Sequence, residues 1–250
     1  MKDDGLMQEH LVDDLALKET FYWWHQIRRN NLVKGLKKHL PDAAKVLEIG
    51  CGTGANLREI KKQGYHVSGL ELDEKAVGYC RDLEVLRADA TKTLPYQNNS
   101  FDAVVILDVL EHLDSPDAVV DEMWRVLKPK GLLVVMVPAD PKLWSYWDEM
   151  LGHYRRYTKK TLRESFGDKW KELDLTYSFS WMYLPVKLFR KFKKVQEDED
   201  HSDFVPVPKI INFMLILCGK IENSIQGIIK MPVGTTVGGF WQKTEKKAEA

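Results

Sequence analysis

The 250-residue chain has no excess of charge of either sign and few cysteines. Its 37 lysines and arginines balance 37 aspartates and glutamates, so no global basic field would attract a phosphate backbone, and we expect no nucleic-acid partner. The three cysteines, Cys51, Cys80 and Cys218, are odd in number and include no Cys-x-x-Cys pair, which argues against a disulfide framework or a zinc knuckle. A reducing, cytoplasmic setting is the one that this cysteine usage favours.

The sequence also lacks a long hydrophobic segment. Its longest apolar run, residues 210–218, is interrupted by Asn212 and is far shorter than the roughly 20 residues that span a bilayer. The first residues, Met1-Lys2-Asp3-Asp4, are acidic and have no apolar core of the kind found in signal peptides. We therefore expect no transmembrane segment and no export.

Short β-branched runs alternate with charged segments of helical period between residues 45 and 137. This pattern predicts an α/β fold with a Rossmann-like, seven-stranded, mostly parallel sheet and helices on both faces. Ser115 is the predicted N-cap of the third helix, Pro116 its first residue, and residues 128–131 its stop. Strands are predicted at 45–49, 66–71, 85–89, 103–108, 132–137, 170–178 and 236–242, and helices between the first strands at 56–63, 74–83 and 116–127.

We expect a single domain, residues 1–250, in which further segments precede and follow the alternating region 45–137. The 55 or so residues between the last two strands are too many for a structureless loop, so they predict a helical insertion. Its two helices, at 182–194 and 208–230, are separated by the acidic run Glu197-Asp198-Glu199-Asp200. The predicted parts are an N-terminal helical cap (1–44, helical over 15–40), a cofactor-binding core (45–178), the insertion (179–235), a last strand (236–242) and a disordered tail (243–250).

A glycine-rich turn, Gly50-Cys51-Gly52-Thr53-Gly54, follows the first predicted strand. Glycine has no Cβ, so such a turn lets a ligand approach the main chain closely. Acidic residues end the first four predicted strands, namely Glu48, Glu71, Asp89 and Asp108, and ligands of open α/β sheets bind outside these strand ends. Glu71 is placed to accept hydrogen bonds from the two hydroxyls of a ribose, so the pattern predicts a nucleoside cofactor.

The glycine turn alone is compatible with two cofactor classes. The dinucleotide-binding fingerprint has its third glycine three positions after the second, and its looser form tolerates Ala55 there, which leaves an NAD-dependent oxidoreductase as an alternative. Further segments match, in order, the pattern of another family. With the glycine turn, residues 89–90, 101–105, 110–113 and 125–131 resemble the class I S-adenosylmethionine-dependent methyltransferases.

This resemblance implies S-adenosyl-L-methionine as cofactor and S-adenosyl-L-homocysteine as product. It places the glycine turn and Leu107 against the methionine part of the cofactor, and Asp89, Ala90 and Leu72 against the adenine. Cys51 is expected to be a small residue of the turn and not a nucleophile. The predicted cofactor-binding residues are Arg28, Glu48, Gly50, Cys51, Gly52, Gly54, Glu71, Leu72, Asp89, Ala90, Leu107, Asp108 and His112.

His112 is the first candidate for a catalytic base. Asp108, Glu111 and His112 occupy positions i, i+3 and i+4 and would share one face if this segment is helical. The spacing also resembles the acid-x-x-Glu-His segment of ubiquinone-biosynthesis O-methyltransferases, where such residues can hold a divalent ion, although those enzymes usually have Glu where this chain has Asp108. We expect no metal here, with His112 lining the methionine pocket and Glu111 pairing locally.

A second polar and aromatic cluster follows the fifth predicted strand, at residues 138–157. A loop at this position is where a methyl acceptor should lie, with His153 as a further base and two arginines suited to a carboxylate or phosphate. The alternative is a structural loop in which Arg155 or Arg156 pairs with Asp148 or Glu149. The predicted substrate contacts are Tyr22, Trp24, Trp144, His153, Tyr154, Arg155, Arg156 and Tyr157.

The cluster also resembles a subgroup of type 11/12 methyltransferases, a resemblance that extends to residues 21–28 and 212–234 and does not specify the acceptor. Tyr22, Trp24 and Arg28 would form a lid, with Arg28 meeting the cofactor carboxylate, unless the aromatic rings only pack the N-terminal helix onto the sheet. We expect a small-molecule acceptor, with O-methylation favoured over N-methylation. The alternative from a different functional class is a regulatory module that binds S-adenosylmethionine without catalysing transfer.

The first helix of the insertion is basic and amphipathic between residues 187 and 194. A solvated helix over the acceptor site is the favoured interpretation, and peripheral contact with anionic lipid is the alternative. The sequence does not determine the oligomeric state.

Overall fold

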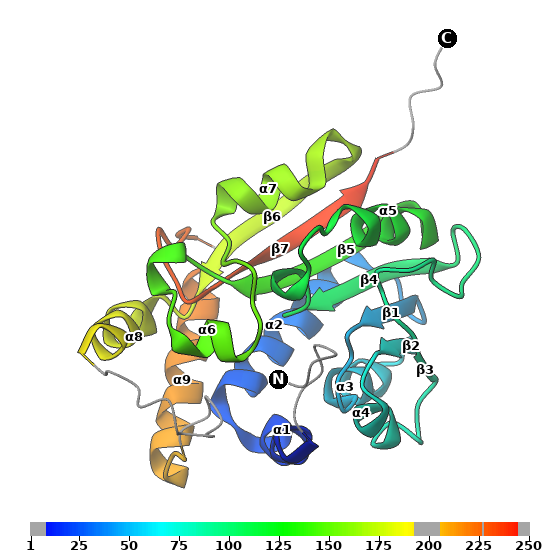
Figure 1. The fold of residues 1–250 in the computed structure, drawn as a ribbon. Coiled ribbons are helices and arrows are strands. Elements are labelled where there is room, and N and C mark those ends of the chain that lie inside the picture. Colours follow the sequence, from blue (N-terminus) through cyan, green and yellow to red (C-terminus); the bar gives the residue numbers. More distant parts are fainter. Residues whose placement is uncertain (1–8, 193–205, 227, 245–250) are drawn as a thin grey trace.

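The computed structural model describes residues 9–192, 206–226 and 228–244 (Figure 1). A seven-stranded sheet with the order β3-β2-β1-β4-β5-β7-β6 runs through its centre. The strand β7 is antiparallel to both of its neighbours, whereas β1 to β5 are parallel, which confirms the predicted mostly parallel sheet. The strands are β1 (Lys45–Ile49), β2 (His66–Glu71), β3 (Val85–Arg87), β4 (Phe101–Leu107), β5 (Leu127–Pro138), β6 (Trp170–Ser178) and β7 (Thr236–Lys243).

Helices cover both faces of the sheet. Successive side chains of β4 point to opposite faces of the sheet, and both sets are apolar, so both faces need a cover. Val104 and Ile106 enter the core beneath α5 and α7, while Ala103 and Val105 enter the core beneath α2 and α3. The helices are α1 (Glu9–Phe21), α2 (Trp23–His39), α3 (Ala55–Lys62), α4 (Glu74–Gly78), α5 (Asp117–Val126), α6 (Tyr146–Met150), α7 (Lys159–Phe166), α8 (Ser180–Phe192) and α9 (Lys209–Ile225), with short 3₁₀ turns η1 (Leu110–His112), η2 (Pro141–Leu143) and η3 (Gly167–Lys169).

The boundaries of α5 differ from the prediction. Pro116, and not Ser115, occupies the N-cap position, and residues 128–131 do not form a stop. The chain passes from α5 directly into β5, because Leu127 already has extended backbone angles and pairs with Phe101 at the start of β4. The fifth strand therefore begins five residues before the predicted one, at Leu127 instead of residue 132.

Strands β3 and β4 end earlier than predicted, and α4 is shorter. As a result, Asp89 lies in the loop after β3, and Asp108 follows β4 with a positive φ of 53°. The long N-terminal helix is interrupted at Tyr22, whose extended backbone separates α1 from α2. The predicted tail also begins too early, since Lys243 is the last residue of β7 and its Nζ donates to the Leu127 carbonyl oxygen.

The N-terminal aromatic residues pack mainly on the insertion. Tyr22 and Trp23 form a buried cluster with Ile27 and Phe179, against which residues of α8 and α9 also pack. Only the second half of α2 reaches the sheet, where Leu32 and Leu36 enter the core. This arrangement differs from the alternative in which the aromatic rings pack the N-terminal helix onto the sheet. The acidic run at 197–200 and residues 193 and 194 of the first predicted insertion helix lie outside the described residues.

Within the described part of the chain, none of the helices combines the length and the apolar character needed to cross a bilayer.

Candidate functional site

The glycine turn between β1 and α3 has a backbone that other residues adopt only with strain. Gly50, Gly52 and Gly54 have φ angles of 69°, 53° and 83°. A Cβ at Gly50 would also lie 2.3 Å from Val109 Cγ2, whereas one at Gly52 would meet no atom closer than 3.8 Å. The turn therefore needs glycine for its conformation throughout, and at Gly52 a Cβ would only come into ordinary contact with Glu19 and Leu15 of α1.

Glu71, at the end of β2, holds this turn in place. Its Oε2 accepts the Gly52 N–H at 2.8 Å, while Oε1 accepts the N–H groups of Leu72 at 2.7 Å and Asp73 at 2.9 Å. A carboxylate offers about four lone-pair positions, so these bonds leave one for a ligand. The structure thus brings Glu71, half-exposed Leu72 and the glycine turn together at the carboxyl end of the sheet.

Asp89 and Ala90 lie in the adjacent loop after β3. Asp89 Oδ1 accepts from both the N–H and the hydroxyl of Thr91, at 2.8 and 2.6 Å, and the hydroxyl bond lowers the pKa of this carboxyl. Ala90 packs on the edge of the core. Because β3 is parallel to β2, both residues are at the same edge of the sheet as Glu71, as the adenine-binding role requires.

Glu48 is buried beneath the glycine turn, with 1% of its surface exposed. Its Oε1 accepts from Asn56 Nδ2 at 2.8 Å, and its Oε2 makes no hydrogen bond within the described residues. Burial raises the pKa of Glu48 to about 8, against the opposite effect of the Asn56 hydrogen bond. Its carboxyl is therefore mostly protonated at neutral pH.

Cys51 and Leu107 are buried in the core on the α2–α3 side. A hydrogen bond with Cys80 and burial both raise the pKa of the Cys51 thiol. A thiol held neutral is a poor nucleophile, which agrees with the passive role expected for Cys51.

Arg28 and Asp108 form an ion pair between α2 and the residue that follows β4. The Arg28 guanidinium is also stacked on Trp24, 4.0 Å from the ring centroid. Arg28 is 6% exposed, yet its Nε and Nη2 have no hydrogen-bond acceptor among the described residues. These buried donors could receive an anionic ligand group. The predicted shared helical face is wrong, because η1 begins only at Leu110 and Asp108 precedes it.

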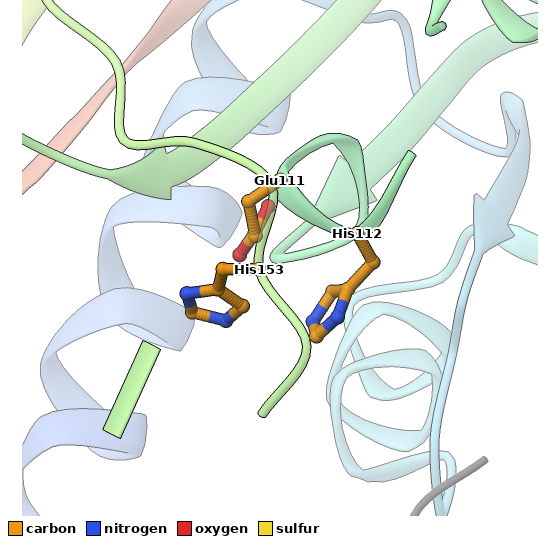
Figure 2. Close-up of side chains that lie close together, drawn as sticks. All are labelled: Glu111, His112 and His153. Carbon is orange, nitrogen blue, oxygen red and sulfur yellow. The ribbon is translucent and has the colours of Figure 1, made fainter. Parts of the chain in front are cut away.

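Glu111, His112 and His153 instead form the cluster of potential metal ligands (Figure 2). One ligand atom from each lies within 4.8 Å of the others, and the two imidazole rings are 4.7 Å apart. Burial and the Asp108 charge raise the pKa of Glu111 well above its usual value, and both carboxyl oxygens lack hydrogen bonds to the described residues. Burial and neighbouring His153 lower the pKa of His112 to about 4, so this ring is neutral at pH 7.

Asp148 orients His153 from the second cluster. Its Oδ1 lies 2.9 Å from His153 Nδ1 and accepts from Arg156 Nε at 2.6 Å, while Oδ2 accepts the Ser145 N–H that begins α6. Burial alone would raise the pKa of Asp148, but His153 and Arg156 outweigh it and lower the pKa to about 2. An ionised carboxylate only accepts hydrogen bonds, so His153 carries its proton on Nδ1 and leaves the lone pair on Nε2.

Several predicted substrate contacts have structural roles instead. Arg156 pairs with Asp148 and also donates to the Ala139 carbonyl oxygen, as the structural alternative for this loop requires. Tyr157 is 2% exposed and its hydroxyl donates to Leu110, and Tyr22 is buried with the N-terminal aromatic residues. The structure thus gives these three side chains packing or positioning roles, and their contact with a substrate stays a prediction.

Other predicted contacts lie at the surface near His153. Trp144 and Tyr154 are 37% and 58% exposed, and the Tyr154 N–H donates to the Glu111 carbonyl oxygen at 2.7 Å. Arg155 donates from Nη2 to the Asp114 carbonyl oxygen. The structure thus brings His153, Tyr154 and Arg155 to η1 and the residues next to it, whereas the Trp144 indole donates to Glu149 of α6.

Two residues beside the site are not predicted from the sequence. The sequence suggests Asp148 only as a partner for an arginine, and no motif surrounds Glu19 of α1. Glu19 accepts a hydrogen bond from the Thr53 hydroxyl, and its carbonyl oxygen accepts from Arg29 at 2.7 Å. The helix α1 therefore lies over the glycine turn, although 34 residues separate Glu19 from Thr53. No local pattern could have predicted this contact.

Comparisons with known proteins agree with this arrangement. Residues 47–135 match the family model described as a methyltransferase domain. A sterol 24-C-methyltransferase of Gibberella zeae is 40% identical over 102 residues, which cover 36% of this chain and 27% of that protein. A demethylmenaquinone methyltransferase of Listeria welshimeri is 29% identical over 165 residues, covering 61% of this chain and 66% of the relative. The chain thus spans about a quarter of the first relative and just under two thirds of the second.

Solved structures share the fold at low sequence identity. A chain from the Haloferax volcanii complex of the Trm112 methyltransferase activator with a methyltransferase superposes with a TM-score of 0.64, at 18% identity over 95% of this chain and 96% of that one. An S-adenosylmethionine-dependent methyltransferase of Thermotoga maritima gives a TM-score of 0.59 at 18% identity, over 95% and 97% of the two chains.

Proposed function

Since this chain belongs to the class I S-adenosylmethionine-dependent methyltransferases, we propose that it transfers a methyl group from S-adenosylmethionine to a small-molecule acceptor. S-adenosylmethionine is the donor typical of this family, and it supplies a methyl group already activated by its sulfonium. The protein then has to align the acceptor and manage its proton.

The residues around the glycine turn fit such a donor. Glu71 retains a lone-pair position beside the turn, and Asp89 lies just after the neighbouring strand end. Arg28 adds buried donors that have no acceptor among the described residues, as the carboxylate of an amino acid would require. The remaining lone-pair position of Glu71 and the unsatisfied donors of Arg28 support the cofactor assignment.

For the acceptor atom, our proposal favours oxygen over nitrogen. A hydroxyl has to lose its proton during methyl transfer, and His153 has a suitable Nε2 because Asp148 holds the proton on Nδ1. His112, neutral at pH 7, provides a second imidazole 4.7 Å away. The Asp148–His153 pair is the single observation that carries this assignment. A cytoplasmic setting is part of the same proposal and is supported by the three free cysteines.

The names of the relatives suggest classes of acceptor to test. Those relatives are named for demethylmenaquinone and for sterols, which are apolar small molecules. We propose assaying transfer of labelled methyl from S-adenosylmethionine into a lipid extract and into a water-soluble metabolite extract, followed by mass spectrometry of the products. The fragment masses identify the acceptor and show whether oxygen, nitrogen or carbon received the methyl group.

His153→Gln should reduce the transfer rate by about 10²- to 10⁴-fold, the usual contribution of a general base, without changing S-adenosylhomocysteine affinity. His66→Gln, at the exposed start of β2, is the matched control and should keep the wild-type rate. Tight S-adenosylhomocysteine binding with no transfer into either extract would contradict catalysis and favour the regulatory module. Displacement of the donor by NAD would instead favour the oxidoreductase.

A further inference from the structure

An exposed apolar stripe runs along α9. It comprises Ile210, Phe213, Met214, Leu217 and Ile221, which are 76%, 66%, 58%, 49% and 51% exposed. Their spacing of three, four, seven and eleven residues from Ile210 places them on one side of the helix. Large apolar side chains gathered in this way on a surface mark an interaction site.

The opposite side of α9 is fixed against the protein. A Cβ added to Gly219 would lie 2.2 Å from Ile27 Cδ1, so α2 and α9 are in close contact. Glu222 accepts the N–H groups of Phe179 and Ser180 at 2.8 and 2.7 Å, and Asn212 accepts the Trp23 N–H at 2.9 Å. These contacts set the rotation of α9, and the apolar stripe has to face outward.

The helix α8 also carries exposed apolar side chains. Leu184 and Leu188 are 64% and 53% exposed, and α8 begins at Ser180, which Glu222 of α9 holds. Both helices lie on the side of the molecule away from β1, β2 and β3 (Figure 1). Two amphipathic helices in this part of the protein therefore carry exposed apolar side chains.

The charge on α8 and α9 has one sign. Lys187, Lys191, Lys209 and Lys220 are exposed, whereas Glu222, the single acidic residue in the sequence of these two helices, is buried. Apolar side chains flanked by exposed lysines complement a bilayer with anionic lipids, in which the apolar side chains enter the interface and the lysines meet the head groups. A second copy of the chain fits less well, because a two-fold contact would bring the lysines of both copies together.

From this geometry we propose that the apolar stripe of α9, together with Leu184 and Leu188 of α8, docks the protein on an anionic membrane surface. The other side of α8 contacts the loop after β5, where the Tyr183 hydroxyl donates to Asp140 and Arg190 donates to the Leu143 carbonyl oxygen. The docking surface is therefore connected to the loop that carries His153. This proposal goes beyond methyl transfer and does not depend on it.

The test uses the full chain and sedimentation with vesicles of phosphatidylcholine alone or mixed with phosphatidylglycerol. We expect enrichment on the anionic vesicles that decreases with added salt. Phe213→Ser with Leu217→Ser should weaken the partition about a hundredfold, since each side chain contributes roughly a factor of ten. Leu17→Ser is the matched control, because Leu17 is a 68% exposed residue of another helix, α1.

Cys218 provides a second readout within the surface, since it is exposed while Cys51 and Cys80 are buried. An environment-sensitive fluorophore on Cys218 should shift to the blue on the anionic vesicles. Circular dichroism and S-adenosylhomocysteine binding establish that each variant is folded. The proposal is overturned if wild-type protein does not sediment with anionic vesicles, or if the double variant sediments equally well. It is also overturned if the double substitution only converts a dimer to a monomer in light scattering, because the surface would then be a protein interface.

Discussion

Glu48 should make the protein less stable as the pH rises through the neutral range. Its carboxyl is 1% exposed and has one hydrogen-bond donor, Asn56, so burial raises its pKa to about 8 from the ordinary 4.5. Between these two values the folded state holds a proton that the unfolded state has released. Because the unfolded state binds fewer protons in this range, the free energy of unfolding falls with increasing pH.

The magnitude follows from the difference of about 3.5 pKa units. Each unit corresponds to about 1.4 kcal/mol, so Glu48 costs about 5 kcal/mol of stability well above pH 8 compared with well below pH 4.5, and about 4 kcal/mol between pH 4.5 and pH 8. The loss between pH 6 and pH 8 alone is about 2 to 3 kcal/mol. Glu48→Gln keeps an oxygen for the Asn56 bond and has no proton to lose, so this variant should lack the dependence.

Urea unfolding of wild type and Glu48→Gln at pH 6 and pH 8 measures the effect. The variant should gain about 2 to 3 kcal/mol relative to wild type between the two pH values, and other titrating groups cancel in the comparison. Glu164→Gln, with a side chain that is 60% exposed on α7, is the control and should change by less than about 0.5 kcal/mol. Parallel pH profiles for wild type and Glu48→Gln would refute the reasoning that burial keeps Glu48 protonated.

Three further predictions concern the site. Arg28→Ala should weaken S-adenosylhomocysteine binding in calorimetry by about tenfold or more, because a charge-assisted hydrogen bond is lost, and unchanged affinity would remove Arg28 from the cofactor site. Asp148→Asn should lower kcat for methyl transfer at least about tenfold with a small change in KM, since the carboxylate that orients His153 is lost, and an unchanged kcat would refute that positioning role. Treatment with a chelator should leave transfer intact, because the proposed base uses the open Nε2 of His153; loss of activity that added Mn²⁺ restores would instead identify Glu111, His112 and His153 as metal ligands.

The central strands and the glycine turn could be predicted because their signals are local. Buried parallel strands appear as apolar runs, as in β4 and β5, and the three glycines of the turn lie within five residues of the sequence. The ends of helices and strands are harder to predict, because they depend on pairing with residues distant in sequence. Residues 128–131 have the composition of a helix stop, yet the pairing of Leu127 with Phe101 brings them into β5.

The site depended on contacts that no local pattern contains. Spacing within one segment suggested that Asp108 joins Glu111 and His112, but Arg28, 80 residues earlier, takes Asp108 into an ion pair. His153 then occupies the place beside Glu111 and His112, from a loop that follows a different strand. The packing of strands and helices determines which side chains become partners. Several such arrangements are compatible with the same spacing in the sequence.

The sequence by itself determined the class of fold and the class of cofactor, because hydrophobic periodicity and the glycine turn with its acidic strand ends are properties of short segments. Only the tertiary structure decided which side chains share an environment. It buried both Glu48 and Asp148, but it placed His153 and Arg156 beside Asp148, so the pKa of Glu48 is raised and that of Asp148 is lowered. It also set the rotation of α9 so that the apolar stripe faces outward. The physical reason is that burial, pairing and exposure depend on neighbours distant in sequence, which are defined only when the sheet and its covering helices have assembled.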